Sequence, residues 1–84
     1  MFRETLLEIR ERLEVSQPTM AEAMGMPFRT YQAIEGGVNP TRPVHLRAAY
    51  TASMQLALSA GRPEMMPADL QELVGELGDM MRRP

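Results

Sequence analysis

The first apolar residues of the chain recur at the spacing of a helix. Steps of four, three and four positions separate Phe2, Leu6, Ile9 and Leu13, and charged residues fill most of the positions between them. An α-helix places residues at this spacing on one face because 3.6 residues complete a turn. The pattern therefore predicts an amphipathic first helix that ends at about residues 15–16.

A second short helix is expected immediately afterwards. Ser16 is a favourable N-cap, and Pro18 follows in the first turn, where its missing N–H costs no hydrogen bond. Met20 and Ala21 belong to a small apolar face, and Gly25 can adopt the left-handed backbone that ends many helices. The segment therefore predicts a short helix followed by a tight turn.

Three further helices complete the predicted fold. Residues 28–35 form a third helix that turns Tyr31 inward, and Thr41 can cap a fourth helix that runs from Arg42 or Pro43 to about residue 59. A fifth helix is expected over about residues 67–82. Its apolar stripe consists of Leu70, Leu73, Val74, Leu77, Met80 and Met81. No segment alternates with the period of two that a strand requires, so the sequence predicts an all-α fold of five helices.

The size and composition of the chain limit its chemistry. Eighty-four residues make one small domain with a marginal core, too small to enclose a substrate pocket on the order of several hundred Å³. The absence of cysteine and the presence of one histidine leave no disulfide framework and no metal cluster. His45 is expected to be an ordinary exposed residue. We therefore expect no enzyme activity, no metal and no cofactor.

Hydropathy and charge indicate a soluble protein with two unlike ends. No apolar run approaches the roughly 18 residues of a membrane span, and no secretory signal is recognisable, which predicts a cytoplasmic protein. The net charge is −2, but residues 27–47 carry three arginines against the single acidic residue Glu35. Residues 64–79 carry five acidic residues and no basic one. A locally positive middle can face phosphates while the acidic segment is turned away.

The stretch "SQPTMAEAMGMPFRTYQAIEGG", residues 16–37, joins two short helical patterns with a glycine, as in helix-turn-helix motifs. It resembles the Cro/lambda-repressor-like, or XRE-type, helix-turn-helix family over roughly residues 5–58. The positions that fit the family pattern without a gap are Gln17, Ala21, Gly25, Thr30, Glu35 and Gly37. The resemblance implies a lambda-repressor-like DNA-binding domain over residues 1–60. The apolar stripe of the fifth helix predicts that the C-terminal segment, residues 61–84, is a dimerisation element.

In this family the third helix enters the major groove of DNA. The residues that the resemblance places against base edges are Phe28, Arg29, Gln32 and Ala33. An arginine can pair with guanine and a glutamine with adenine through two hydrogen bonds each. Contacts with phosphates or with the minor groove are expected from Gln17, Thr30, Asn39, Arg42 and Arg47.

The resemblance also implies an ion pair that joins the first helix to the end of the third, between Arg10 and Glu35. Three positions depart from the family pattern. Pro27 replaces the usual Ser or Thr cap, a loss of roughly 1 kcal/mol; Tyr31 is larger than the usual Val or Ile; and Gly36 shortens the charged end of the motif.

Several of these assignments have simpler structural alternatives. Arg29 and Gln32 are also typical of an ordinary solvent-facing helix surface, and Phe28 fits the core as well as a DNA groove. Gln17 can be an ordinary polar residue at a helix start, and Arg47 can simply cover the fourth helix. The apolar stripe of the fifth helix is expected to form the dimer interface. The alternative is that it folds back onto the first and fourth helices.

The resemblance implies a sequence-specific DNA-binding transcriptional regulator. We expect a homodimeric repressor at an inverted-repeat operator, with half-sites about 34 Å apart. One alternative keeps the fold and makes the chain an antitoxin or a phage-type autorepressor, with a toxin or phage protein as partner. The other alternative is an all-α protein-interaction adaptor that does not bind DNA.

Overall fold

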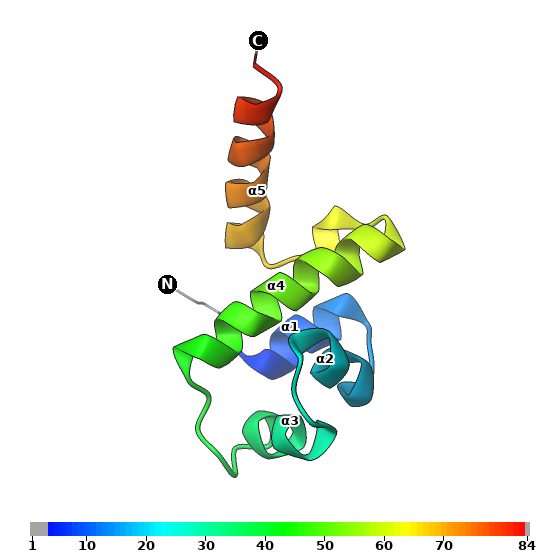
Figure 1. Ribbon diagram of the computed structural model, residues 1–84, viewed down its shortest axis with the longest axis vertical. Coiled ribbons are helices and arrows are strands. Elements are labelled where there is room, and N and C mark those ends of the chain that lie inside the picture. Colours follow the sequence, from blue (N-terminus) through cyan, green and yellow to red (C-terminus); the bar gives the residue numbers. More distant parts are fainter. Residues whose placement is uncertain (1–3, 84) are drawn as a thin grey trace.

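The computed structural model describes residues 4–83, which fold into five α-helices and one short 3₁₀ helix (Figure 1). The elements are α1 (Leu6–Leu13), α2 (Gln17–Met24), α3 (Phe28–Glu35), α4 (Pro43–Ala60), η1 (Pro63–Met65) and α5 (Ala68–Met81). Residues 4–83 contain no strand, so the predicted all-α class is confirmed. Phe2, which begins the first predicted apolar stripe, lies outside the described residues.

Side chains that flank α1 and α2 fix where these helices begin. Thr5 and Glu8 form a reciprocal capping box at the start of α1, in which each side chain accepts the backbone N–H of the other residue. Ser16 Oγ accepts the backbone N–H of Thr19 at 3.3 Å, as its position before α2 predicts. These bonds satisfy N–H groups that a helix cannot pair internally.

The start of α4 at Pro43 is one of the two that the sequence predicted, but the predicted cap is wrong. Thr41 does not cap this helix, because α4 begins at Pro43 and Arg42 is the N-cap residue. The Arg42 backbone N–H donates to His45 Nδ1 at 3.0 Å. His45 is half-buried, so the expectation of an ordinary exposed histidine was wrong. A proline that fixes the first helical position is the reason, since it moves the start one residue past the predicted cap.

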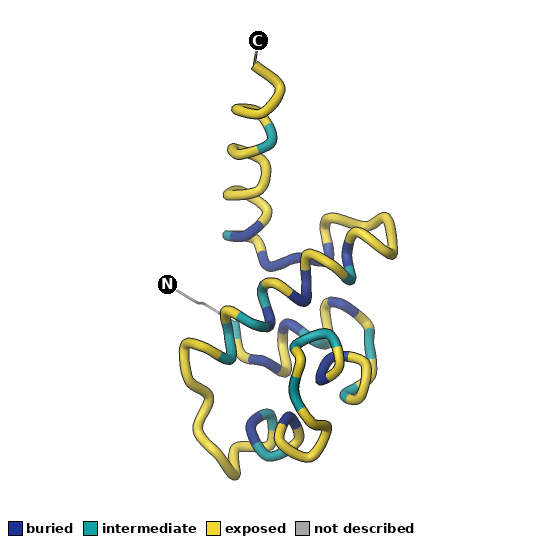
Figure 2. Tube along the Cα trace, viewed as in Figure 1, coloured by how far each residue is buried: buried dark blue, intermediate teal, exposed yellow. Residues whose placement is uncertain are grey.

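The core lies where α1, α2 and α3 pack beneath α4 (Figure 2). Large apolar side chains from the three short helices meet small ones on α4, where Ala49, Ala52 and Ala57 are buried. Small residues let α4 approach its neighbours closely. The fully buried side chains from α1, α2 and α3 include Leu6, Ile9, Leu13, Met20 and Tyr31.

Helix α5 extends away from this core, and the described chain measures 48 × 25 × 18 Å (Figure 1). Its base is anchored by Met65, Met66 and Leu70, each 6% exposed. Tyr50 on α4 donates its hydroxyl proton to the Asp69 carboxylate, with oxygen–oxygen distances of 2.8 and 2.9 Å. Burial, reinforced by the hydrogen bond with Asp69 and its charge, raises the pKa of Tyr50 to about 12. This contact and the buried base set the direction of α5.

The predicted apolar stripe of α5 is divided between two environments. Leu70 was predicted to lie on an interface between copies, but it is buried within the protomer, because the turn at Pro67 brings the first turn of α5 against η1. The rest of the stripe does not fold back onto α1 and α4. Its exposed residues are Leu73, Val74, Leu77, Met80 and Met81.

Glu14 ends α1 with a left-handed backbone, φ 57°, and no other non-glycine residue described in the structure has a positive φ. We expect Glu14→Gly to raise the free energy of unfolding by roughly 0.5–1 kcal/mol. Glycine removes the steric penalty of the left-handed conformation. It also loses more conformational entropy on folding than glutamate, which offsets part of this gain. Thermal or urea unfolding measures the difference.

The control for this variant is Glu14→Gln, which keeps the positive φ and removes the ion pair with Arg62. That pair is 3.2 Å long and both side chains are at least half exposed, so its loss should change stability little. An equal gain in both variants would show that charge, rather than backbone strain, limits stability at this position.

Candidate nucleic-acid interface

A tight turn sets the position of α3 against α2. Gly25 adopts φ 75° at the end of α2, and the backbone N–H of Met26 donates to Ala21 O at 3.0 Å. Ala21 is 1% exposed, because a larger side chain at this position would push the two helices apart. Pro27 precedes α3 and provides no side-chain cap, as the sequence predicts. The α2–turn–α3 unit is therefore held by its backbone and by buried contacts.

The Glu35 carboxylate is the hydrogen-bonding centre beneath α3. It accepts Arg10 Nε at 2.7 Å and Arg10 Nη2 at 3.3 Å, the Tyr31 hydroxyl at 2.8 Å, and the Gln17 side-chain amide. Arg10 also donates from Nη1 to Val15 O at 3.1 Å. The side chain of Glu35 is only 5% exposed and that of Arg10 is 19% exposed. One carboxylate therefore links α1, α2 and α3.

These contacts change the acidity of the groups that make them. Burial disfavours the charged carboxylate of Glu35, but hydrogen bonds from Arg10, Gln17 and Tyr31 outweigh it and lower the pKa below the ordinary 4.5. Burial, and then the hydrogen bond to Glu35, raise the pKa of Tyr31 well above its usual range. Glu35 is therefore charged and Tyr31 neutral at neutral pH, as the hydrogen-bond directions require.

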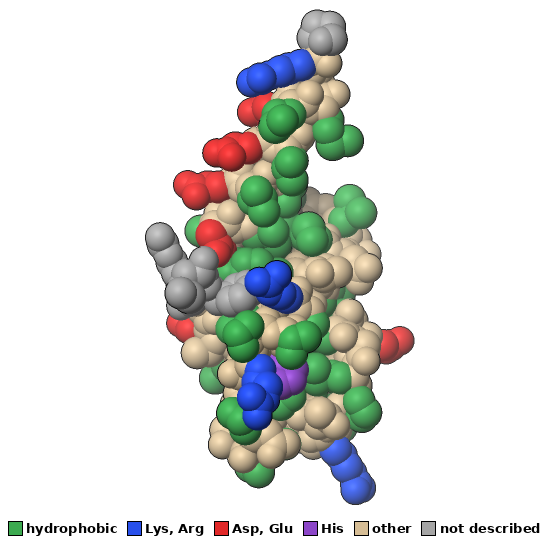
Figure 3. Space-filling model, turned by 60° about the vertical axis from the view of Figure 1, so that its left-hand side comes forward, with side chains coloured by type: hydrophobic (Ala, Val, Ile, Leu, Met, Phe, Trp, Pro, Cys, Tyr) green, Lys and Arg blue, Asp and Glu red, His purple; other side chains and the backbone are tan. Residues whose placement is uncertain are grey.

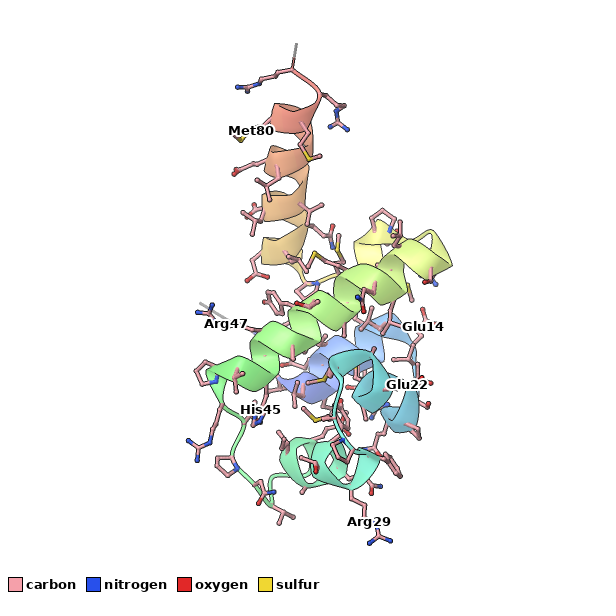
Figure 4. All side chains as sticks on the ribbon, in the orientation of Figure 1. Glu14, Glu22, Arg29, His45, Arg47 and Met80 are labelled. Carbon is pink, nitrogen blue, oxygen red and sulfur yellow. The ribbon has the colours of Figure 1, made fainter. Side chains whose placement is uncertain are left out.

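The outer face of α3 presents the residues predicted to read bases. Arg29 and Gln32 are exposed, Phe28 is 40% exposed, and Ala33 is half-buried. Thr30, which was predicted to contact phosphate, is exposed on the same helix. Figure 4 shows Arg29 pointing away from the body, at the end of the molecule opposite α5. Phe28 thus contributes to the outer surface as well as to packing, and the face combines a cation, an amide and an aromatic ring.

The arginines of the described chain fall into two groups. Ion pairs with acidic side chains hold Arg10, Arg12, Arg62 and Arg82. Within residues 4–83, the guanidinium groups of Arg29, Arg42, Arg47 and Arg83 make no ion pair. The three arginines predicted to contact DNA are thus available as cations. Of the paired arginines, Arg10 is part of the mostly buried framework, whereas the pairs of Arg62 and Arg82 lie on the exposed surface.

The other predicted phosphate contacts are in different situations. Arg42 and Arg47 are exposed near the start of α4, and Figure 4 shows Arg47 on the flank of α4, away from Arg29. Asn39 is exposed in the loop before α4, and its backbone N–H donates to Ala33 O at 3.0 Å. The Gln17 amide is directed to Glu35, so it acts first as a structural donor.

Sequence reasoning missed two of the hydrogen bonds to Glu35. The Tyr31 hydroxyl bonds to Glu35, which explains why a tyrosine suits a position where Val or Ile is usual in the family that the sequence resembles. The spacing of four between these residues on one helix was the available signal. The contact from Gln17 to Glu35 depends on how two helices pack, so no local pattern could reveal it.

Other kinds of site find little support in the described chain. No group of three or more His, Cys, Asp or Glu side chains within residues 4–83 could hold a metal ion. None of the helices in this range has the length and apolar character needed to cross a bilayer. Comparison with protein-family models, curated proteins and solved structures gives no significant match to this chain.

We expect Arg10 and Glu35 to be energetically coupled. In a double-mutant cycle with Arg10→Met and Glu35→Gln, the interaction term in the free energy of unfolding should be on the order of 1 kcal/mol. The pair is mostly buried, and each single change leaves its partner without a counter-charge. Arg12→Met with Glu35→Gln is the control cycle and should be additive; equal terms in both cycles would contradict a specific pair.

The lowered pKa of Glu35 gives stability a defined pH dependence. The folded protein holds its proton less tightly than the unfolded chain, so Glu35 contributes stability fully above the unfolded pKa of about 4.5. This contribution declines as the pH falls from that value and is lost below the folded pKa. Thermal unfolding from pH 7 to pH 3 should therefore show a smaller acid-induced loss for Glu35→Gln than for the unaltered protein. Parallel curves would contradict this assignment.

Proposed function

We propose that the chain is a sequence-specific DNA-binding regulator of transcription, with a lambda-repressor-like helix-turn-helix domain and α3 as the helix that enters the major groove. The observation that carries the proposal is the contrast between the two sides of α3. Its inner side is fixed by Tyr31, Ile34 and Glu35, whereas its outer side presents an unpaired Arg29 and an exposed Gln32. A rigid helix with free hydrogen-bonding side chains suits base reading.

In this mechanism phosphate contacts set the register and base-edge contacts set the specificity. Arg29 bonds to guanine N7 and O6, and Gln32 bonds to adenine N6 and N7. Arg42 and Arg47 approach the backbone beside the groove, and the exposed Thr30 supports the same contacts. The Glu35 network contributes indirectly, because its bonds to α1 and α2 fix the angle at which α3 meets the duplex.

The acidic net charge is compatible with this function because the charges are separated in space. The acidic residues of α5 lie at the opposite end of the molecule from α3 (Figures 1 and 3). Exposed charges separated by more than about 10 Å are largely screened at 0.1 M salt. The DNA-facing end therefore behaves locally as a positive surface.

Repression is the simplest regulatory outcome, since a protein of this size bound at a promoter occludes polymerase without needing a further domain. The antitoxin and phage-type alternatives use the same DNA-binding surface and add a protein partner. The adaptor alternative gains support from one feature, the exposed apolar side chains of α5, but it assigns no role to the unpaired arginines of α3 and α4.

We expect Arg29→Ala to reduce selectivity for the operator while the fold is retained. Loss of one bidentate base contact should cost roughly 1–3 kcal/mol of specific binding, or about 5- to 150-fold. The operator is first selected from random duplexes, and binding is then compared on that sequence and on a scrambled duplex at one fixed salt concentration. The selected sequence should lose affinity and the scrambled one should lose much less.

Arg62→Ala is a suitable control because Arg62 follows the end of α4 farther from α3 and pairs with Glu14 and Glu64. It should leave both affinities unchanged. Equal losses on both duplexes for Arg29→Ala would assign this side chain to phosphate, and no loss on either would exclude α3 as the reading helix.

A further inference from the structure

An apolar corner lies between α5 and the end of α4. A cavity of about 370 Å³ opens there, lined mainly by Met54, Leu58, Pro63, Met66 and Val74. Leu58 is 83% exposed and Met54 is 38% exposed. Figure 3 shows hydrophobic side chains continuing from α5 onto the body of the protein. The corner is therefore one continuous apolar surface, formed by two helices that meet at an angle.

The protein exposes more surface than a compact monomer of its mass. Its accessible surface is 5797 Å², whereas a monomer of 9.5 kDa is expected to expose roughly 5,000 Å². The difference, roughly 700–800 Å², is close to the ~800 Å² that each partner buries in a standard protein–protein interface. Helix α5 contributes to this exposed surface, since only its first turn is buried.

Charge is distributed unevenly along α5. Asp69, Glu72 and Glu76 lie on its first two-thirds, and Arg82 and Arg83 follow its last turn. Figure 3 shows the acidic side chains along one edge of the helix and a basic side chain at its tip. Of the two arginines, Arg82 pairs with the exposed Asp79 and Arg83 has no partner within residues 4–83. Two copies of this helix are complementary when they run in opposite directions.

We propose that the corner binds α5 of a second copy of this chain, with the two α5 helices antiparallel and crossing near the middle of the exposed stripe. Leu73 and Leu77 of both copies meet at the crossing. Met80 and Met81 of each copy enter the cavity of the other, where flexible thioether side chains can fill an irregular apolar space. Arg82 and Arg83 then lie beside the acidic half of the partner helix.

A parallel pair satisfies fewer of these features. It places the acidic halves of the two helices beside each other, where their like charges repel. It also brings the two bodies together at the base of α5, where Leu70 is already buried and the helix packs against η1. The cavity would receive no side chain from the exposed end of the partner helix. The antiparallel pair instead uses the whole exposed stripe.

This inference deepens the proposed function, and its consequence for DNA rests on that function. Because α3 and α5 lie at opposite ends of the protomer (Figure 1), an antiparallel pair carries its two α3 helices at its two far ends. The inverted-repeat operator expected from the sequence, with half-sites about 34 Å apart on one duplex, cannot then be read by both protomers of one pair, so the antiparallel dimer replaces that expectation. Each protomer instead binds its own segment of DNA, and the dimer joins two segments.

Sedimentation equilibrium without DNA tests whether a second copy of the chain binds the corner. The unaltered protein should dimerise, and Leu77→Glu should raise the dissociation constant of the dimer at least tenfold. Leu77 is 51% exposed, so the change should leave the helical circular dichroism and the thermal transition intact. Val38→Glu is the matched control, because Val38 is 81% exposed in the loop between α3 and α4 and should have no effect. A protein that stays monomeric at millimolar concentration would overturn the proposal and leave the corner to a different protein.

A distance measurement tests the direction of pairing. The chain has no cysteine, so Arg83→Cys offers a single site for a nitroxide spin label. In an antiparallel pair the two labels lie at opposite ends of the crossing, roughly 20 Å or more apart along the helix axes. A parallel pair places them about 10 Å apart, the ordinary separation of packed helices. A short distance in the dimer would overturn the antiparallel arrangement.

These outcomes are separable from a failure of the proposed function. A Leu77→Glu monomer that still selects one DNA sequence supports both the α5 contact and reading by α3. A dimer that binds no DNA sequence specifically supports the α5 contact and removes the DNA-binding function. If the unaltered protein is a monomer but still binds one DNA sequence specifically, only the α5 inference is removed.

Discussion

The arrangement of the three short helices depends on one nearly buried carboxylate. An isolated helix of eight residues is not stable in water, so α1, α2 and α3 exist because they pack on one another and on α4. Apolar packing alone tolerates small rotations between helices, whereas the bonds that converge on Glu35 are directional. The carboxylate accepts from α1, α2 and its own helix at once. The orientation of the outer face of α3 follows from this arrangement, and with it any use of that face for recognition.

Local sequence patterns predicted most of the fold. The period of the apolar residues located five helices, and the cap at Ser16 and the left-handed Gly25 follow from short-range chemistry that does not depend on the rest of the chain. The prediction failed where two local signals competed, at Thr41 and Pro43. It also left the stripe of α5 unresolved, because the direction of a helix after a turn depends on tertiary contacts. Here those contacts are the Tyr50–Asp69 hydrogen bond and the burial of Leu70.

The candidate site divides in the same way. The exposure of Arg29 and Gln32 could be predicted, since it follows from which side of α3 is apolar. The commitment of Gln17 to Glu35 could not be predicted, because it joins residues 18 positions apart on two helices. The pairing state of each arginine is also a property of the folded surface. Nine arginines look alike in the sequence, and only their neighbours in the fold distinguish an ion-paired arginine such as Arg10 from one without an ion pair such as Arg29.

The outer face of α3 and the exposed apolar stripe of α5 have different physical requirements, and the fold separates them in space. A DNA-facing surface gains from cations that have no internal partner, whereas an apolar contact surface loses if unpaired charge is buried within it. Placing α3 and α5 at opposite ends of a 48 Å molecule keeps the two demands apart. The rigid link between them is α4, which packs on the short helices near its start and holds α5 through Tyr50. In the proposed dimer, a change in the angle of α5 would therefore alter how the two α3 surfaces are related without altering either surface itself.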